Sequence, residues 1–144
     1  MTQWMIAPGE RLKDWRSFRQ TLDNTDLKTS LQNLVDWFKT APLSSRVIDI
    51  YDSTTWPGPW DLLYAGDMDE NAIALAMAYS LQLCDIDCEV LFAQDREEHF
   101  MGLVVMVDNR YVLGYTYGEV DECSCLSTCS IVERHKVKNL LKQG

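Results

Sequence analysis

The sequence predicts one α+β domain: an N-terminal helical hairpin, a buried central helix packed on a small antiparallel sheet, and a C-terminal helix. Three observations predict it. Apolar residues recur at helical spacing before residue 41. A stretch at 71–83 is apolar on every face of a helix. Two runs rich in β-branched and aromatic residues follow, separated by a two-residue turn. A chain of 144 residues fits one domain with a real core.

The first part of this domain, residues 1–60, contains the helical hairpin and a loop rich in Trp and Pro. Helices are expected at 10–22 and 27–40, and Pro42 ends the second. Their apolar stripes are Leu12, Trp15, Phe18 and Leu22, then Leu27, Leu31, Leu34 and Phe38. The segment 46–51 alternates weakly and is a candidate strand or extended segment.

The loop Trp56-Pro57-Gly58-Pro59-Trp60 cannot be helical throughout, because each proline biases the preceding residue towards extended geometry. Trp56 and Trp60 are candidate binding residues, since two tryptophans on a stiffened loop can form a platform for a peptide. The alternative is that the loop closes one end of the core. Residues 61–65 read as a short helix that ends at Gly66 in the left-handed conformation.

The core, residues 61–120, begins at the start of the central helix. Asp67 is a candidate N-cap, and Glu70 stands three residues later, as in a capping box. Both are candidate contact residues. After the helix we expect a strand at 88–93 and a hairpin formed by 99–107 and 110–115, with Asp108-Asn109 as its turn. Residues 121–144 are expected to end in a helix from Ser130 to Lys142, with His135 on its surface.

The net charge of −9 is unevenly distributed. Residues 1–60 hold seven basic and seven acidic side chains, residues 61–122 two basic and fourteen acidic, and residues 123–144 four basic and one acidic. An acidic middle opposes direct contact with nucleic acid. It suits a basic protein partner, an acidic surface that mimics nucleic acid, or simply a solvated face. No apolar run is long enough to span a membrane. Without a signal sequence at the start of the chain, the expected location is the cytoplasm.

The five cysteines do not predict a secreted disulfide framework, because their number is odd and no signal sequence precedes them. Cys123, Cys125 and Cys129 have a spacing unusual for zinc and are weak metal candidates, to which Cys84 or Cys88 could add a fourth thiolate. Reduced structural or surface thiols are the alternative. No P-loop, GxGxxG, GxSxG or HExxH motif is present, so no cofactor is predicted.

The order of helical hairpin, central helix, strand and hairpin resembles the papain-like core of the transglutaminase-like superfamily. In that family a cysteine nucleophile opens the central helix, a histidine begins a following strand, and a carboxylate on the next strand orients the histidine. The nucleophile position falls on Asp69 or a residue beside it, and none of these is cysteine. The histidine position falls on His99. The carboxylate position falls on Gly114. The resemblance therefore implies a catalytically degenerate member.

This resemblance implies a non-catalytic interaction or structural module with protein partners. The Trp56–Trp60 loop and the residues after it look like segments of small phage-encoded proteins. They suggest a virion component of the tail, baseplate or head, while an acidic inhibitor of a basic host protein is a variant. The enzymatic alternative is a hydrolase or transferase that uses His99 with Asp69 as a base for water, or with a displaced cysteine. A small zinc-binding module is a third hypothesis.

Overall fold

The computed structural model describes residues 2–44 and 48–143. Its helices are α1 (Pro8–Arg19), α2 (Leu27–Phe38), α3 (Pro59–Ala65), α4 (Glu70–Gln82) and α5 (Val137–Gln143). Its strands are β1 (Cys88–Asp95), β2 (Phe100–Val107), β3 (Tyr111–Leu113), β4 (Val120–Glu122) and β5 (Ser130–Lys136). Short 3-10 turns occupy η1 (Asn24–Asp26), η2 (Ser53–Thr55) and η3 (Cys123–Leu126). No helix among the described residues is both long and apolar enough to traverse a lipid bilayer.

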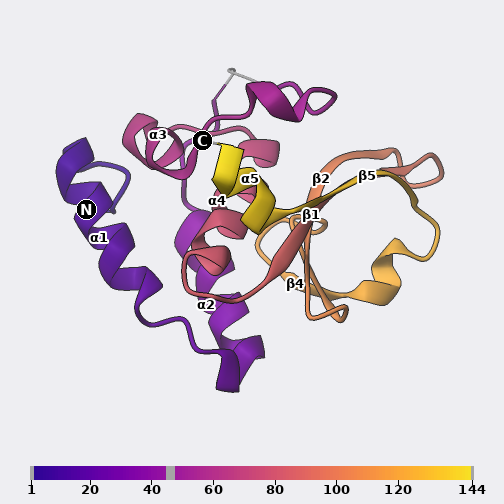
Figure 1. Ribbon diagram of the computed structural model, residues 1–144, viewed down its shortest axis with the longest axis horizontal. Coiled ribbons are helices and arrows are strands. Elements are labelled where there is room, and N and C mark those ends of the chain that lie inside the picture. Colours follow the sequence, from indigo (N-terminus) through magenta and orange to yellow (C-terminus); the bar gives the residue numbers. More distant parts are fainter. Residues whose placement is uncertain (1, 45–47, 144) are drawn as a thin grey trace.

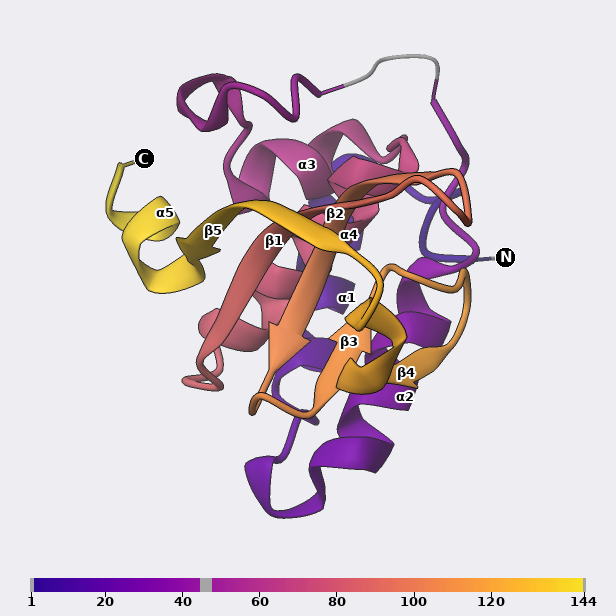
Figure 2. The same cartoon turned by 90° about the vertical axis from the view of Figure 1, so that its right-hand side faces the viewer.

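The five strands form one antiparallel sheet in the order β4-β3-β2-β1-β5. The helices α1 to α4 gather on one side of this sheet, and η3 lies over its other face (Figures 1 and 2). The predicted fold class, a central helix on a small antiparallel sheet, is confirmed. The sheet is larger than predicted because β4 and β5 extend it at both edges.

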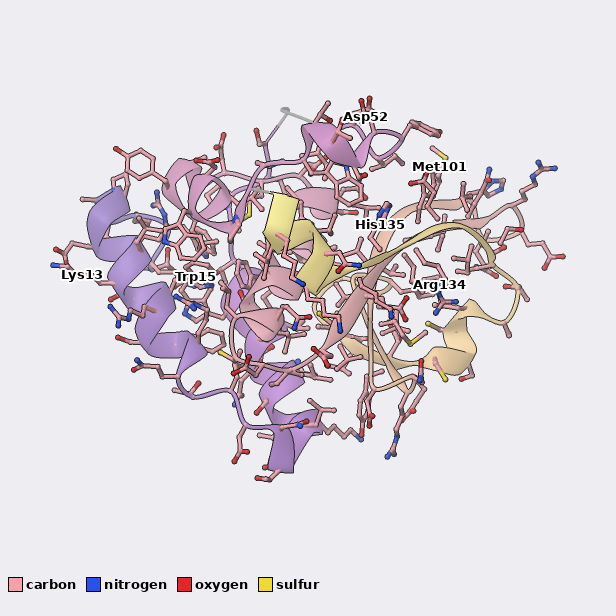
Figure 3. All side chains as sticks on the ribbon, viewed as in Figure 1. Lys13, Trp15, Asp52, Met101, Arg134 and His135 are labelled. Atoms are coloured by element: carbon pink, nitrogen blue, oxygen red, sulfur yellow. The ribbon has the colours of Figure 1, made fainter. Side chains whose placement is uncertain are left out.

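Helix α4 forms the centre of the core, as its sequence predicts. Every residue from Ala72 to Leu81 is buried. Small alanine side chains on this helix let β1 and β2 approach on one side and α2 and α3 on the other. Trp15 points inward from α1, whereas Lys13 on the same helix points to solvent (Figure 3). The indole Nε1 of Trp15 donates a hydrogen bond of 2.9 Å to Ser80 Oγ, which joins α1 to α4.

The N-terminal helices pack differently from a simple two-helix hairpin. Helix α1 lies against α3, where Trp15 meets Trp60 edge-on at 5.8 Å between ring centroids. It meets α2 through the stacked pair Phe18 and Trp37, at 5.3 Å. The predicted stripe of apolar residues on α1 is therefore shared between two partners, because α3 offers it an aromatic surface.

One predicted element is wrong, and another is described only in part. The expected helix from Ser130 to Lys142 is instead strand β5 followed by α5. Residues of β5 are alternately exposed and partly buried, which is the period of a strand and not of a helix. The candidate strand 46–51 falls partly outside the described residues, and its described part, 48–51, is irregular. There the Asp49 side chain accepts a hydrogen bond of 2.9 Å from the Tyr51 amide, a turn that competes with strand pairing.

Candidate functional site

The start of α4 is capped by Asp69. Its Oδ1 accepts a 2.7 Å hydrogen bond from the amide of Ala72, and the helix begins at Glu70. The predicted capping box from Asp67 to Glu70 is therefore wrong by two residues. Asp67 is partly buried and has an interaction partner of its own. Glu70 is exposed in the first turn, where its negative charge suits the helix dipole.

Met68 precedes the cap and is 1% exposed. Its backbone is fixed on both sides, because its amide donates to Pro42 O at 3.1 Å and its carbonyl accepts from Ser44 N at 3.1 Å. These bonds form a short parallel bridge with Leu43. Of the three positions aligned with the family's nucleophile, one is therefore packed inside, one caps the helix and one, Glu70, is exposed.

His99 lies outside the strand that it was predicted to begin. It ends the turn before β2, with φ of +55°, and is exposed. Within the described part of the chain its imidazole forms no hydrogen bond, whether to Asp69 or to Glu97 and Glu98. The pair of His99 and Asp69 that the enzymatic alternative requires is therefore absent from the described residues.

Gly114, aligned with the orienting carboxylate, directly follows β3 and has φ of +88°. A Cβ atom here would lie 3.3 Å from Ala74 Cβ and 3.4 Å from the carbonyl oxygen of Leu103. A side chain is thus disfavoured both by the left-handed backbone and by close packing. The backbone itself therefore disfavours a carboxylate at this position.

Asn71 is a residue of this region that the sequence analysis missed. Its Oδ1 accepts a 2.9 Å hydrogen bond from Leu103 N and so ties the first turn of α4 to β2. A Cβ atom on Gly102 would lie 2.8 Å from the same oxygen. The available signal was one amide side chain opening an apolar helix, and one glycine in a β-rich run.

The two candidate binding tryptophans lie in different environments. Trp56 is half-buried, donates from Nε1 to Asp49 O at 2.6 Å, and meets the ring of His135 edge-on at 5.1 Å. Trp60 belongs to α3 and is 53% exposed. Each ring packs against a different part of the fold, Trp56 on His135 of β5 and Trp60 on Trp15 of α1. His135, predicted on a helix surface, lies in β5 with its side chain 21% exposed, close to Glu133.

The cysteines lie away from the start of α4. Cys84 and Cys88 are at the opposite end of α4, where their thiols donate to Arg19 O and Ala78 O. The other three, Cys123, Cys125 and Cys129, belong to η3 and the segment after it. Across residues 2–44 and 48–143, no three Cys, His, Asp or Glu side chains are arranged to hold a metal ion.

Burial raises the pKa of four of the five thiols and so favours their protonated form. It raises the pKa of Cys88 to about 12 and that of Cys125 to about 11. Burial also raises the pKa of Cys84 and of Cys129, and for Cys129 the nearby Asp95 carboxylate adds to the effect. Reactive cysteines have the opposite environment, in which positive charge lowers the pKa.

Asp95 at the end of β1 is a second residue that the sequence analysis missed. It is 1% exposed, and its carboxylate accepts hydrogen bonds from Thr128 Oγ1 at 2.5 Å and from the amides of Glu97 and Glu98. The thiol of Cys129 lies 3.9 Å away. Asp95 and His99 line one shallow hollow of about 320 Å³. The bond from Thr128, more than any other effect, lowers the pKa of Asp95.

Two further hollows lie at opposite ends of α4. A cavity of about 160 Å³ opens beside the helix start, and Glu70, Phe100 and Gly114 all line it. A larger hollow of about 380 Å³ lies beyond the other end, where Asp85, Lys136 and other side chains of both charges line it. Of these two, the smaller cavity is lined by two positions aligned with the family's catalytic residues, Glu70 and Gly114, whereas His99 lines the hollow beside Asp95.

The fold and this arrangement place the molecule among proteins with the transglutaminase-like, papain-like fold. No protein-family profile and no curated protein sequence matches the chain. Among solved structures it is similar to Legionella pneumophila LapG, which has this fold, at 15% identity and a TM-score of 0.68 over 88% of this chain and 75% of that one. Calcium-bound LapG gives 13% and 0.70 over 90% and 76%. EGTA-treated LapG gives 14% and 0.67 over 87% and 72%.

Proposed function

We propose that this chain is a non-catalytic protein-binding module built on a transglutaminase-like fold. One observation carries the proposal: no thiol stands at the start of α4, where Met68 is packed inside and Asp69 caps the helix. Cysteine catalysis on a papain-like fold needs a thiolate there, because the helix N-terminus and an adjacent imidazole stabilise its negative charge. His99 and Gly114 support the same conclusion, since the first faces solvent and the second carries no carboxylate.

The hydrolase alternative has one supporting feature, a displaced thiol. Cys129 touches Asp95, and Asp95 shares its hollow with His99. A carboxylate beside a thiol raises the pKa of that thiol, which is the opposite of what nucleophilic attack requires. The Asp69 pathway is also weakened, because Asp69 caps α4 through Oδ1 and no hydrogen bond joins it to the exposed His99 among the described residues. Neither arrangement supplies an activated nucleophile.

Thiol labelling across a range of pH tests the proposal. At pH 7 a thiol with a pKa of 9 or more is about 1% thiolate or less, so its labelling by iodoacetamide should be slow and rise about tenfold per pH unit. Cys123 is exposed and is expected to react first. A Cys123→Ser variant should remove that phase and leave the rest unchanged. A cysteine whose rate is already maximal at pH 7 and falls on mild acidification would overturn the proposal, as would peptidase activity lost on mutating His99.

The biological setting that we propose is a larger protein assembly, such as a phage particle, in which the chain contacts protein and not nucleic acid. The acidic middle supports a basic partner, and an inhibitor of a basic host protein uses the same surface. Gel filtration with light scattering of the purified chain, alone and after co-expression with its genomic neighbours, tests this setting. A chain that stays monomeric in every combination contradicts it.

A further inference from the structure

The cavity beside the start of α4 is enclosed by four elements. Val35 of α2 with Ile73 and Met77 of α4 form its apolar floor, and all three are buried. Phe100 at the start of β2 forms one wall. Glu70 and Glu119, both exposed, stand at its edge. We call this cavity the Gly114 pocket, after the glycine in its wall.

The opposite wall of the Gly114 pocket, residues 114–119, is held in place by bonds to its neighbours. The Tyr117 hydroxyl donates to the Lys39 carbonyl at the end of α2. The amide of Thr116 donates to Asp121 Oδ2 at 3.1 Å, and Gln32 of α2 reaches the Gly118 carbonyl at 3.5 Å. A wall fixed at three points gives the pocket a preformed shape, which lowers the entropic cost of binding.

The size of the pocket selects one kind of occupant. Sites for drug-sized ligands usually hold about 300–1,000 Å³. The Gly114 pocket holds about 160 Å³ and has an apolar floor. It therefore fits one large apolar side chain, of the kind that anchors a peptide to a protein surface.

The charge at the edge selects what flanks that side chain. Glu70 follows Asp69 directly, and Glu119 lies two residues before Asp121 in the chain. The cation in the pocket, Lys39, forms a 3.2 Å ion pair with Asp36, so its charge is largely offset. The edge is therefore negative, and electrostatic complementarity favours a positively charged partner segment.

We infer that the Gly114 pocket binds an extended basic segment of a partner protein, with one large apolar side chain in the pocket and Lys or Arg residues against Glu70 and Glu119. This inference deepens the proposed function and rests on it, since the retired catalytic end of α4 becomes the binding surface. Two positions aligned with the family's catalytic residues, Glu70 and Gly114, lie here at the edge and in the wall of the pocket.

The test is titration of the ¹⁵N-labelled chain with two lysine-rich dodecapeptides, one with a central leucine and one with alanine in its place. The leucine peptide should shift the amides of Ile73, Phe100 and residues 115–119. The alanine peptide should bind at least fivefold more weakly. Raising the salt from 50 to 300 mM should weaken the leucine peptide several-fold, because it screens the edge charges.

Matched variants separate the pocket from general acidity. Glu70→Gln with Glu119→Gln should weaken the leucine peptide at least fivefold. The control, Asp61→Asn with Glu98→Gln, removes the same charge, including one carboxylate from the first turn of a helix, outside the pocket. It should leave binding within twofold. Tyr117→Phe, which removes only the hydroxyl bond to Lys39, should weaken binding by loosening the wall, and Tyr117→Ala should weaken it at least as much.

Equal affinity for the two peptides, equal loss in both pairs of variants, or shifts that avoid the pocket would overturn the inference. Each of these results would leave the proposed function standing, because slow thiol labelling and partner binding elsewhere do not depend on the pocket. Conversely, an activated thiol would contradict the proposed function whatever the peptides do.

Discussion

Removing the guanidinium of Arg11 should destabilise the fold markedly. Arg11 is 4% exposed, and its Nε and Nη2 donate to the carbonyls of Leu63 and Tyr64 at 2.7 and 2.9 Å. These carbonyls belong to the last turn of α3, which has no further helical partners for them. Nη1 also reaches the Ile6 carbonyl at 3.2 Å. One side chain therefore joins the N-terminal segment, α1 and α3.

The magnitude follows from these contacts. Each of the two short hydrogen bonds to a charged donor contributes about 1.5–3 kcal/mol. Immobilising the long side chain costs about 2 kcal/mol. We therefore expect Arg11→Ala to lower the free energy of unfolding by about 1–4 kcal/mol. For a domain of this size that corresponds to about 2–4 °C in the melting temperature per kcal/mol.

Gly66 provides a second perturbation of the same contact. It ends α3 with φ of +74°, and a Cβ atom there would lie 2.5 Å from Arg11 Cζ. Gly66→Ala should therefore cost about 1–2 kcal/mol for the left-handed backbone, plus the displacement of the guanidinium. Because both variants disturb one contact, the double variant should cost less than the sum of the single ones.

Urea unfolding followed by circular dichroism measures all of these variants, with Arg16→Ala as the control. Arg16 is an exposed cation on the same helix and should change the stability by less than about 0.5 kcal/mol. An Arg11→Ala variant as stable as this control would refute the account. Strict additivity of Arg11→Ala and Gly66→Ala would show that the two residues do not act on each other.

Three further predictions concern the site and its surroundings. Asn71→Ala should destabilise the protein by about 1–3 kcal/mol, because the Leu103 amide loses its partner, and calorimetry would show the loss. Gly114→Asp should cost at least about 1 kcal/mol and produce no amide hydrolysis in a peptidase assay. Thr128→Val should make the unfolding midpoint fall less steeply as the pH is lowered from 6 to 2.5. The pKa of Asp95 is lower in the folded state than its ordinary 3.8, so its contribution is present above about pH 4 and lost as the pH falls below that. Unfolding midpoints between pH 2.5 and 6 measure this.

The central helix could be predicted because its signal is local. Eight consecutive residues from Ala72 to Tyr79 are apolar or nearly so, and a helix apolar on every face must lie inside. Strand β5 could not be predicted in this way. Its partner β1 lies about forty residues earlier, and its alternation places Glu133 and His135 on the partly buried side. The lysines at 136, 138 and 142 resemble the basic last turn of a helix, and this pattern favoured the wrong prediction.

The sequence predicts which catalytic residues of the family the candidate site lacks, but not the contacts that the site forms instead. The absence of cysteine near position 69 and of a carboxylate at position 114 is plain in the sequence. The burial of Asp95 is not, because an aspartate followed by Glu97 and Glu98 looks like a solvated connection. Asp95 becomes a buried acceptor because Thr128, 33 residues later in the chain, donates a hydrogen bond to it. Long-range pairing of this kind leaves no local pattern.

The contacts at positions 68, 71 and 114 also explain why no single substitution there should produce cysteine-type catalysis. A cysteine at position 68 would be enclosed in the bridge to Leu43, where burial raises the pKa of a thiol. An aspartate at position 114 would face Ala74 at van der Waals distance on a left-handed backbone. Asn71 already bonds the helix start to β2. Nucleophilic catalysis requires a nucleophile, a base and an orienting group within bonding reach of one another. Here the described residues bring no such three groups together at the start of α4, and the open space lies beside it, in the Gly114 pocket.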